Sequence, residues 1–404
     1  TLAQIFKSNG YATGHFGKWH LGINYPYAPY YRGFDTSLML GNGGLGATDD
    51  YWGNDRFDDT YFLNGKPFKT KGFGTDAFVN NALDFIQKHK NNPFFVYLAP
   101  NIVHRPWNIS SKYSQKYDST LIDEPGVVPY TKGSMARFYG TIDKIDEQVG
   151  RVLAFLEERH LAENTIILFL TDNGTVSREY NAGMRGRKGS VYEGGHRVPL
   201  FIRWPAGNLP SGFAVQELTC HMDITPTLID LCQLDIKENL PFDGKSLVPL
   251  LYKEPEGWDN GRIYITQSTQ GVPGGYHVTA PKYGNTMVAR GKWRLVNHRE
   301  LYNVDEDPGQ KMDVADRYHE VVSDLKTAYE QYWKEVQPEM AKIRRIDIGN
   351  PRHPLAVFSP MNILPREGMD YGGLWSTAAT VDAKKFQGQW MVNVKQEGEY
   401  GIEL

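Results

Sequence analysis

Residues 79–99, VNNALDFIQKHKNNPFFVYLA, decide the fold class. Apolar side chains recur at helical spacing through the first part of this stretch, at Val79, Ala82, Leu83 and Ile86. The turn residues 91–93 then lead into a continuous apolar run over residues 94–99, which is typical of a strand buried on both faces. A helix that leads directly into a buried strand predicts an α/β structure, with helices packed on a sheet.

The same order of helix and strand recurs along the chain. A helical stripe of apolar residues precedes the apolar run of residues 165–170, and it consists of Ile142, Ile145, Val149, Val152 and Leu156. Near the N-terminus, Leu2, Ile5 and Phe6 share one face of a short helix that Gly10 ends. We therefore expect residues 1–255 to form an α/β domain with a mostly parallel sheet flanked by helices.

The pattern changes after residue 255. Short predicted strands, joined by Gly and Asn turns, follow at residues 262–266, 286–290 and 293–297. An amphipathic helix is predicted over residues 318–336. We expect residues 256–345 to form a smaller, antiparallel α+β domain at the C-terminal side of the first.

The two ends of the sequence predict interrupted elements. Residues 346–404 are richer in Pro and Gly, and their last part alternates apolar and polar residues on both sides of a turn at 397–399. We expect an incomplete β module here, ending in a hairpin whose second strand, residues 400–404, is cut short. Because the sequence opens inside a helical pattern at Thr1, we also expect a preceding portion, which would hold any signal peptide.

Composition excludes several classes of protein. The 404 residues carry 44 Lys and Arg against 47 Asp and Glu, so the net charge of -3 provides no basic field for a nucleic acid. No apolar run is long enough to span a bilayer. The two cysteines, Cys220 and Cys232, lie in apolar-patterned segments and are expected to be buried thiols rather than a disulfide framework. An anionic substrate would therefore need a local cluster of cations.

Polar residues directly after predicted strands are the first candidates for a site, because ligands collect at the carboxyl ends of the strands in α/β sheets. The strand that ends at residue 170 is followed by Asp172 and Asn173, whose oxygens suit Ca²⁺ or Mg²⁺. The alternative is an Asx turn. The strand that ends at residue 99 is followed by His104 and Arg105, held between prolines, where His104 is a candidate for proton transfer or for contact with an anion.

Two further clusters contain basic residues. Lys18 and His20 are two residues apart, so they project to the same side if the segment is extended. Lys188 lies in a basic run flanked by glycines, which is either a solvated loop or a fixed cation near a ligand. His196 follows shortly after, and it either touches substrate or is a buried, hydrogen-bonded histidine. Arg105, Trp107 and the polar and aromatic stretch 50–55 are predicted substrate contacts, since such side chains suit a sugar.

The sequences of these segments and their order along the chain resemble a known family. Residues 10–20, GYATGHFGKWH, closely resemble the second signature of the sulfatase family. The resemblance continues through IVHRP at 102–106, TDNG at 171–174, the Lys188 loop, EGGHRVP at 193–199, MDITPTL at 222–228, DGKSL at 243–247 and LYNVD at 301–305. It covers nearly the whole chain as far as about residue 336.

The resemblance implies a fold, an activity and roles for particular residues. Sulfatases of this kind have the alkaline phosphatase-like fold and hydrolyse sulfate esters with a formylglycine, made from a Cys or Ser, beside a calcium ion. By resemblance, Asp172 and Asn173 supply half of the calcium ligands, and Lys18 and His104 bind sulfate. His20 then acts next to the formylglycine, and Lys188 contacts the sulfate and the leaving oxygen. Fixed positive charge where negative charge accumulates, with an acid at the leaving alkoxide, is what such a reaction needs.

The family pattern also requires an Asp-Asp metal pair and a Cys-x-Pro-Ser-x-Arg motif before residues 17–20, and neither is present. Cys220 and Cys232 lie in other contexts, and the pairs 49–50 and 58–59 are expected to belong to a surface loop. We therefore predict that residues 1–404 alone are catalytically inactive. For the family member itself, we expect a sulfuric ester hydrolase acting on sulfated carbohydrate.

Two other interpretations remain open. A phosphonate or phosphate ester hydrolase of the same superfamily is possible because that fold supports both chemistries. The second interpretation is a catalytically inactive homologue that binds sulfated glycans. The presence of His20 argues against it, because a protein that only binds has less use for a residue that serves turnover. The resemblance also implies a formylglycine-generating or sulfatase-maturing enzyme as a partner, and a periplasmic or secreted location.

Overall fold

The computed structural model describes residues 1–41, 43–117, 134–176, 180–236, 241–254, 256–268, 281–340, 342, 344–365 and 388–403. The chain divides into two compact units, Thr1–Ala162 together with Ile343–Leu404, and Glu163–Lys342. These units are defined by which residues lie close together in space. The domain boundaries at residues 255 and 345 were drawn from changes in composition and periodicity along the sequence, and they stay a prediction.

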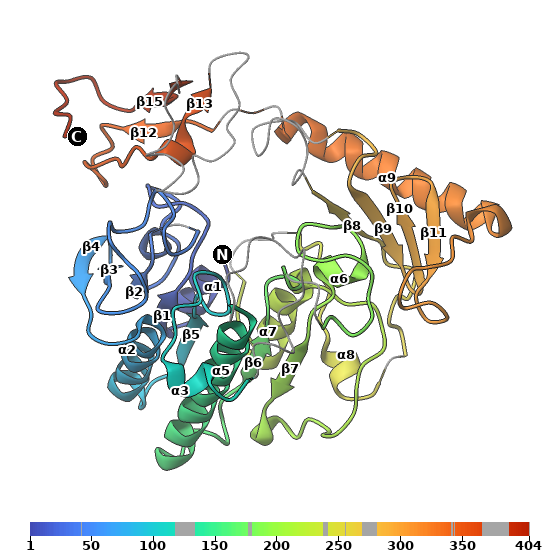
Figure 1. The fold of residues 1–404 in the computed structure, drawn as a ribbon, viewed down its shortest axis with the longest axis horizontal. Coiled ribbons are helices and arrows are strands. Elements are labelled where there is room, and N and C mark those ends of the chain that lie inside the picture. Colours follow the sequence, from blue (N-terminus) through green and yellow to red (C-terminus); the bar gives the residue numbers. More distant parts are fainter. Residues whose placement is uncertain are drawn as a thin grey trace. The chain divides into compact units, whose positions relative to one another are not determined.

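The first unit is built on a five-stranded mixed sheet (Figure 1). Its order is β4-β3-β2-β1-β5, and its strands are Ala12–Gly17 (β1), Thr36–Met39 (β2), Thr60–Leu63 (β3), Lys66–Lys69 (β4) and Phe94–Ala99 (β5). Strand β1 pairs in parallel with both β2 and β5, whereas the β2–β3 and β3–β4 pairs are antiparallel. Of these five strands, the sequence predicted β5, and the parallel pairing of β1 with β2 and β5 agrees with the expected parallel sheet in this half of it.

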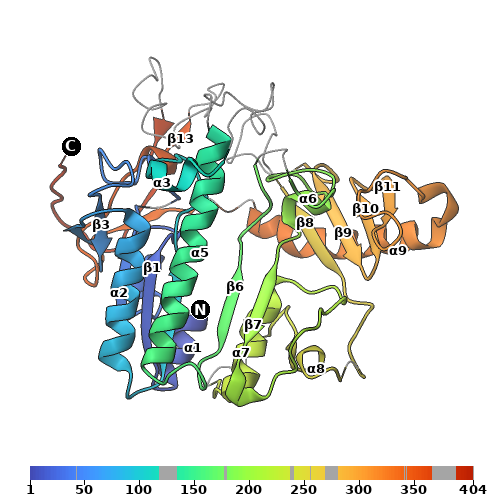
Figure 2. The ribbon, with the colours of Figure 1, turned by 60° about the horizontal axis from the view of Figure 1, so that its bottom comes forward.

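Helices pack on this sheet and on one another (Figure 2). Leu2–Ser8 (α1) and Gly74–His89 (α2) contact the sheet, Ser134–Glu158 (α5) contacts α2, and Ser111–Ser114 (α3) contacts α5. Thr1 caps α1 through a capping box with Gln4. In α2, Asp76 lies in the first turn and Lys88 and His89 lie in the last, which matches the helix dipole at both ends. Figure 2 shows α2 and α5 running alongside each other.

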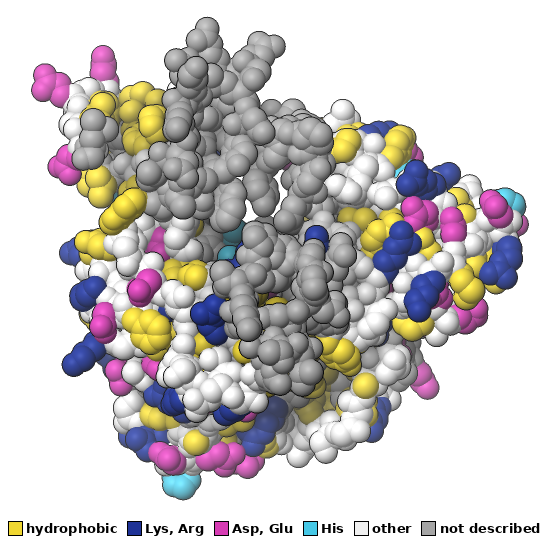
Figure 3. Space-filling model, viewed as in Figure 1, with side chains coloured by type: hydrophobic (Ala, Val, Ile, Leu, Met, Phe, Trp, Pro, Cys, Tyr) yellow, Lys and Arg dark blue, Asp and Glu magenta, His cyan; other side chains and the backbone are white. Residues whose placement is uncertain are grey.

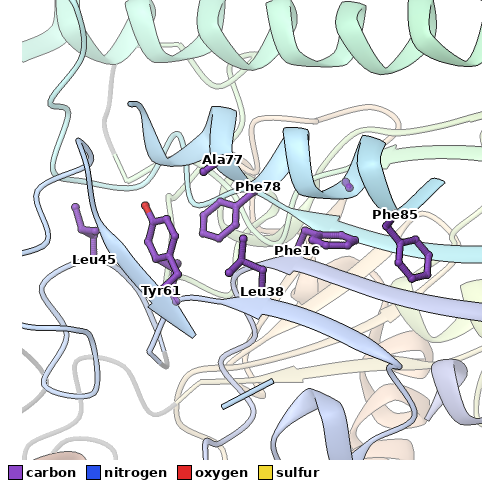
Figure 4. Close-up of a cluster of buried hydrophobic side chains, with 9 residues drawn as sticks. Phe16, Leu38, Leu45, Tyr61, Ala77, Phe78 and Phe85 are labelled. Carbon is purple, nitrogen blue, oxygen red and sulfur yellow. The ribbon is translucent and has the colours of Figure 1, made fainter. Parts of the chain in front are cut away.

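The core of the first unit lies between α2 and the sheet (Figure 4). Phe78 and Phe85 of α2 meet Phe16 of β1 and Leu38 of β2, and all four side chains are at most 5% exposed. Each such burial contributes about 1.5–3 kcal/mol. The helical periodicity that predicted α2 therefore corresponds to the face that packs on the sheet.

The C-terminal segment of the chain returns to the first unit. It contributes the strand pairs Ile346–Ile348 (β12) with Val392–Val394 (β15), and Leu364–Pro365 (β13) with Gly388–Gln389 (β14). The Asn24 amide donates to the Val357 carbonyl and accepts from the Val357 N–H, each over 2.8 Å. Because these partners are 333 residues apart, the first unit is assembled from both ends of the chain.

The second unit contains a two-stranded and a four-stranded antiparallel sheet among its described residues. Ile167–Leu170 (β6) pairs with Leu200–Arg203 (β7), and short helices at Glu193–His196 (α6), Ile224–Cys232 (α7) and Val248–Leu251 (α8) accompany them. The second sheet has the order β11-β10-β9-β8, with strands Tyr264–Gln267 (β8), Thr286–Arg290 (β9), Trp293–Val296 (β10) and Glu300–Asn303 (β11). Helix α9, His319–Met340, packs on it through Leu325, Tyr329 and Trp333.

Several predictions are confirmed and others need correction. The antiparallel sheet with its single long helix is confirmed. Strand β5 is only partly buried, with Tyr97 45% exposed, because β5 is the edge strand of the five-stranded sheet. The prediction of a terminal hairpin is wrong, because residues 400–403 form no strand. Strand β15, which was expected to pair with them, instead pairs in parallel with β12. Leu404 lies outside the described residues. Both cysteines are free, as expected, but only half-buried.

No helix in the described ranges is long and apolar enough to cross a membrane. On the face drawn in Figure 3, the described Lys and Arg side chains lie scattered among Asp and Glu side chains. This distribution agrees with the net charge of -3. Positive charge for an anionic ligand must therefore come from a few particular residues.

Candidate active site

In the first unit, the loops after β1 and β5 start side by side. Gly17 is paired with Ala99, and the Lys18 N–H donates to the Ala99 carbonyl over 2.7 Å. Gly17 has a φ of +122°, and a Cβ at this position would lie 2.0 Å from the Ala99 oxygen. Only glycine permits this approach. The carboxyl ends of two parallel strands thus bring the Lys18 loop and the His104 loop to one edge of the sheet.

His15 holds the backbone of Lys18 in place. Its ring is completely buried, with Nδ1 3.0 Å from Ser37 Oγ and Nε2 3.1 Å from the Lys18 carbonyl oxygen. Since a carbonyl only accepts, Nε2 carries the hydrogen and Nδ1 accepts from the serine. Burial lowers the pKa of His15 to about 4, so the ring is neutral at physiological pH. Sequence reasoning missed His15 because its burial and its two hydrogen-bond partners are tertiary properties.

A glycine-rich loop, of which Gly41 and residues 43–46 are described, lies against both His20 and His104. His20 is exposed and has a positive φ of 51°. A Cβ at Gly43 would lie 2.5 Å from His20 Nε2, and a Cβ at Gly44 would lie 3.8 Å from His104 Nδ1. Both imidazoles therefore lie against this loop, which has no side chains in the way at these two positions.

Asp50 holds the glycine-rich loop. Its carboxylate accepts from the Gly46 N–H over 3.1 Å and from the Asn54 amide over 3.1 Å. Burial raises the pKa of Asp50 to about 6. The prediction that the pair 58–59 belongs to a surface loop is wrong for Asp59. This residue is 1% exposed, and its carboxylate accepts a hydrogen bond from the Tyr61 hydroxyl over 2.7 Å. These carboxylates anchor loops, and sequence gives no direct sign of it.

The loop that carries His104 is fixed by a buried arginine. Arg56 is 4% exposed, and its guanidinium donates to the backbone carbonyls of Pro106 (2.6 Å), His104 (2.5 Å) and Asn101 (3.3 Å). Burial lowers the pKa of Arg56 to about 10, which leaves it charged. His104 Nδ1 lies 2.8 Å from the Arg105 carbonyl, so Nδ1 carries the hydrogen in the neutral ring. Arg56 was not among the predicted residues.

The two predicted substrate contacts in this loop differ in their surroundings. Arg105 is exposed. Trp107 is 7% exposed, its ring lies 5.3 Å from that of Phe138, and its indole N–H donates to the Val103 carbonyl over 2.9 Å. The structure therefore gives Trp107 a packing role, because little of its surface is left for a sugar. In the stretch 50–55, Trp52 is 73% exposed.

In the second unit, three predicted residues lie on loops that are joined by backbone hydrogen bonds. Asp172 and Asn173 follow β6, and the Gly174 N–H donates to the Gly195 carbonyl of α6 over 3.0 Å. A Cβ at Gly174 would lie 2.0 Å from the Gly194 oxygen, so this contact also requires glycine. The Lys188 N–H donates to the Thr175 carbonyl over 2.8 Å. The structure thus brings Lys188 to the loop of Asp172 and Asn173.

Helix α6 is anchored by a buried ion pair, and His196 lies at its end. Glu193 is 2% exposed and accepts from Arg294 Nε over 2.7 Å. Burial alone would raise the pKa of Glu193, but Arg294 holds it below its ordinary value. His196 is half-buried, with Nε2 3.3 Å from the Val191 carbonyl, and burial lowers its pKa. This geometry favours the hydrogen-bonded alternative for His196.

Asp172 and Asn173 offer a carboxylate and an amide oxygen, the hard ligands that a calcium ion takes. Because Ca²⁺ binds six to eight oxygens, these two residues fit the ion but make only part of its shell. Within the described ranges, no group of three or more His, Cys, Asp and Glu side chains is arranged to hold a metal.

Comparison with known proteins defines the family. The family described as Sulfatase matches residues 1–234, and N-sulphoglucosamine sulphohydrolase, C-terminal, matches residues 187–335. The chain is 31% identical over 274 residues to an arylsulfatase of Hemicentrotus pulcherrimus, covering 62% of this chain and 46% of that protein. It is 29% identical over 269 residues to human N-acetylgalactosamine-6-sulfatase, covering 62% of this chain and 48% of that protein.

Solved structures agree with this assignment. The crystal structure of Ps i-CgsB in complex with k-i-k-neocarrahexaose aligns with a TM-score of 0.68 at 25% identity, over 82% of this chain and 73% of that one. The fold is alkaline phosphatase-like, with a smaller antiparallel C-terminal sheet. The chain belongs to the sulfatase family. It spans about half the length of the arylsulfatase and the human enzyme.

Proposed function

We propose that the protein is a sulfuric ester hydrolase that acts on a sulfated carbohydrate. The observation that carries this proposal is the meeting of Lys18, His20 and His104 at one edge of the sheet in a member of the sulfatase family. The substrate class is supported by the relatives, one of which is named for N-acetylgalactosamine 6-sulfate and another of which was solved with a neocarrahexaose.

Charge gives each residue its proposed role. Lys18 binds the oxygens of the sulfate, where negative charge accumulates during attack on sulfur. The family resemblance gives Lys188 the same role. His104 also binds sulfate, and its position is set by the Arg105 carbonyl and by the Arg56 guanidinium beneath its backbone. His20 serves proton transfer at the nucleophile. A formylglycine, which the family resemblance implies, would supply the attacking hydroxyl when present.

A calcium ion is the proposed cofactor. Asp172 and Asn173 would hold it through their side-chain oxygens. Bound there, the ion would supply positive charge to the sulfate oxygens. The loop that carries both residues is tied to α6 and to the Lys188 loop, so ion and cation are positioned by the same backbone network. We also propose a sulfatase-maturing enzyme as partner and a secreted or periplasmic location.

The experiment compares paired ligands and matched variants. A panel of galactose, N-acetylgalactosamine and glucosamine sulfates is titrated calorimetrically against the wild type and the variants Lys18→Ala and His104→Ala. Each variant should lose about 10- to 150-fold in affinity, the value of a hydrogen bond to a charged group. Lys88→Ala, an exposed lysine in the last turn of α2, should bind like the wild type.

Turnover separates the interpretations. Release of sulfate from a bound sugar, exceeding release of phosphate from the matched phosphate ester, supports the proposal. Preference for the phosphate or phosphonate ester would move the assignment to that class of hydrolase. Binding without turnover supports a glycan-binding homologue, or, for residues 1–404 by themselves, the inactivity predicted from their sequence.

A further inference from the structure

Asn101 contains a buried amide whose two polar atoms have no hydrogen-bond partner among the described residues. Its side chain is 4% exposed, and neither Oδ1 nor Nδ2 forms a hydrogen bond within that part of the chain. Gln310 differs, because its Oε1 accepts from the Glu193 N–H and only its Nε2 is unpaired. A buried polar group without partners destabilises a fold, so its presence calls for an explanation.

The amide lies beside a point that is lined by polar atoms. An ideal Cβ at Gly44 would lie 3.7 Å from Asn101 Nδ2, 3.8 Å from Asn101 Oδ1 and 3.8 Å from His104 Nδ1. These are the three nearest atoms, and all belong to side chains that can form hydrogen bonds. Because residue 44 is glycine, it places no side chain of its own over the amide.

The position of Asn101 is fixed by its backbone. The Asn101 and His104 carbonyls accept hydrogen bonds from the same nitrogen, Nη2 of Arg56. The facing loop is held by Asp50 through the Gly46 N–H. The amide and the imidazole are therefore presented at a set separation before any ligand arrives, which is the arrangement that a binding group requires.

Resting on the proposed function, we propose that the Asn101 amide binds a ring hydroxyl of the sulfated sugar, next to the sulfate held by His104. Sulfate oxygens only accept hydrogen bonds, so a sulfate would satisfy Nδ2 and leave Oδ1 unpaired. A hydroxyl both donates and accepts, so one hydroxyl, or two on neighbouring carbons, pairs both atoms of the amide. Asn101 would thus select the sugar, whereas the cations select the sulfate.

Two variants test this by independent routes. Asn101→Ala removes the amide. Gly44→Ala keeps the amide but places a methyl group at the open point, and its distances of 3.7–3.8 Å are ordinary van der Waals contacts, so the fold is retained. Asn81→Ala, an α2 amide that donates to the Ala77 carbonyl, and Gly150→Ala, which meets nothing within 4 Å, are the matched controls.

The tightest-binding sugar of the panel is titrated together with its singly deoxygenated analogues and with inorganic sulfate. We expect the wild type to lose about 10-fold or more in affinity for one deoxy analogue. Asn101→Ala and Gly44→Ala should each bind the parent sugar about 10-fold or more weakly than the wild type does. Each variant should bind that deoxy analogue as tightly as it binds the parent sugar. Both variants should bind inorganic sulfate with wild-type affinity. Both controls should match the wild type throughout, and thermal melting confirms folding.

The outcomes separate this inference from the proposed function. If the wild type binds a sulfated sugar and both variants bind it equally well, Asn101 is not a binding group and the inference alone is overturned. If both variants lose affinity for inorganic sulfate to the same extent, the amide contacts the sulfate instead of the sugar, and the inference is again wrong. If the wild type binds no sulfated sugar in the panel, both proposals are overturned.

Discussion

Replacing Gly17 by alanine tests the close approach of β1 and β5. The added Cβ would lie 2.0 Å from the Ala99 carbonyl oxygen, whereas a carbon and an oxygen need about 3.3 Å. The strands must separate by about 1.3 Å. The hydrogen bond from the Lys18 N–H to the same oxygen, 2.7 Å long, then stretches to about 4 Å and is lost.

The expected cost has two parts. A positive φ costs an alanine about 1–2 kcal/mol. The lost hydrogen bond and the displaced strand add about 2–3 kcal/mol, because the Ala99 carbonyl and the Lys18 N–H lose each other as partners. Gly10→Ala isolates the first part, since Gly10 also has a positive φ, +82°, but a Cβ there meets nothing within 4 Å. Gly17→Ala should therefore be less stable than Gly10→Ala by about 2–3 kcal/mol.

Urea unfolding followed by tryptophan fluorescence measures the difference. Because the chain has two compact units, the same transition is compared in both variants. Gly17→Ala should also bind sulfated sugars more weakly, since the displacement includes Lys18. If the two variants differ by less than about 0.5 kcal/mol, the strands tolerate a side chain at this position and the reasoning from geometry is wrong.

Three further predictions concern buried charged and titratable groups. Glu193→Gln should destabilise the protein by roughly 3–5 kcal/mol at neutral pH, because Arg294 stays buried without its partner. Since the pKa of Glu193 is lowered, this stabilisation is complete above pH 4.5 and is lost as the pH falls further, so melting temperatures of wild type and variant should converge in acid. His15 has its pKa lowered from 6.5 to about 4, so the unfolded chain binds the proton first, and stability should fall by about 3 kcal/mol as the pH drops through this window. His15→Gln should abolish that part of the pH dependence in urea titrations. Arg56→Lys keeps the charge but replaces the guanidinium fork, which holds the Pro106 and His104 carbonyls, with a single ammonium. The affinity of this variant for sulfated sugars should fall, whereas that of Lys88→Ala should equal the wild-type affinity. Equal affinities of Arg56→Lys and wild type would show that the His104 loop keeps its conformation without the guanidinium.

Sequence periodicity predicted the elements whose apolar faces are buried. Helix α2 and strand β5 lie where the spacing placed them, and the antiparallel sheet with α9 is also confirmed. Strands β1 and β2 and the antiparallel half of the first sheet were missed. The β3–β4 hairpin turns through Asn64-Gly65, both with positive φ, which is a strong local signal for a two-residue turn. The signal was present, but the flanking strands are too short to alternate clearly.

The candidate site was predicted from two kinds of signal. His104 and Asp172 were found because each lies just beyond a predicted strand, whereas Lys18 was found by its spacing to His20 and by the family resemblance. Arg56 was not, because its three acceptors lie 45 to 50 residues further along the chain and no local pattern connects them. Asn101 differs from an ordinary loop asparagine only by its burial and its lack of partners, and both are tertiary properties.

The pairing of Asn24 with Val357 has a consequence for synthesis of the protein. The first unit needs residues at both ends of its sequence, and Val357 is translated 333 residues after Asn24. At about 5–20 residues per second, roughly 20 to 70 s pass before this partner exists. During that interval the second unit is made, while the Asn24 amide still bonds to water. A ribosome-bound chain should therefore acquire protease resistance in residues 163–342 before the first unit is complete.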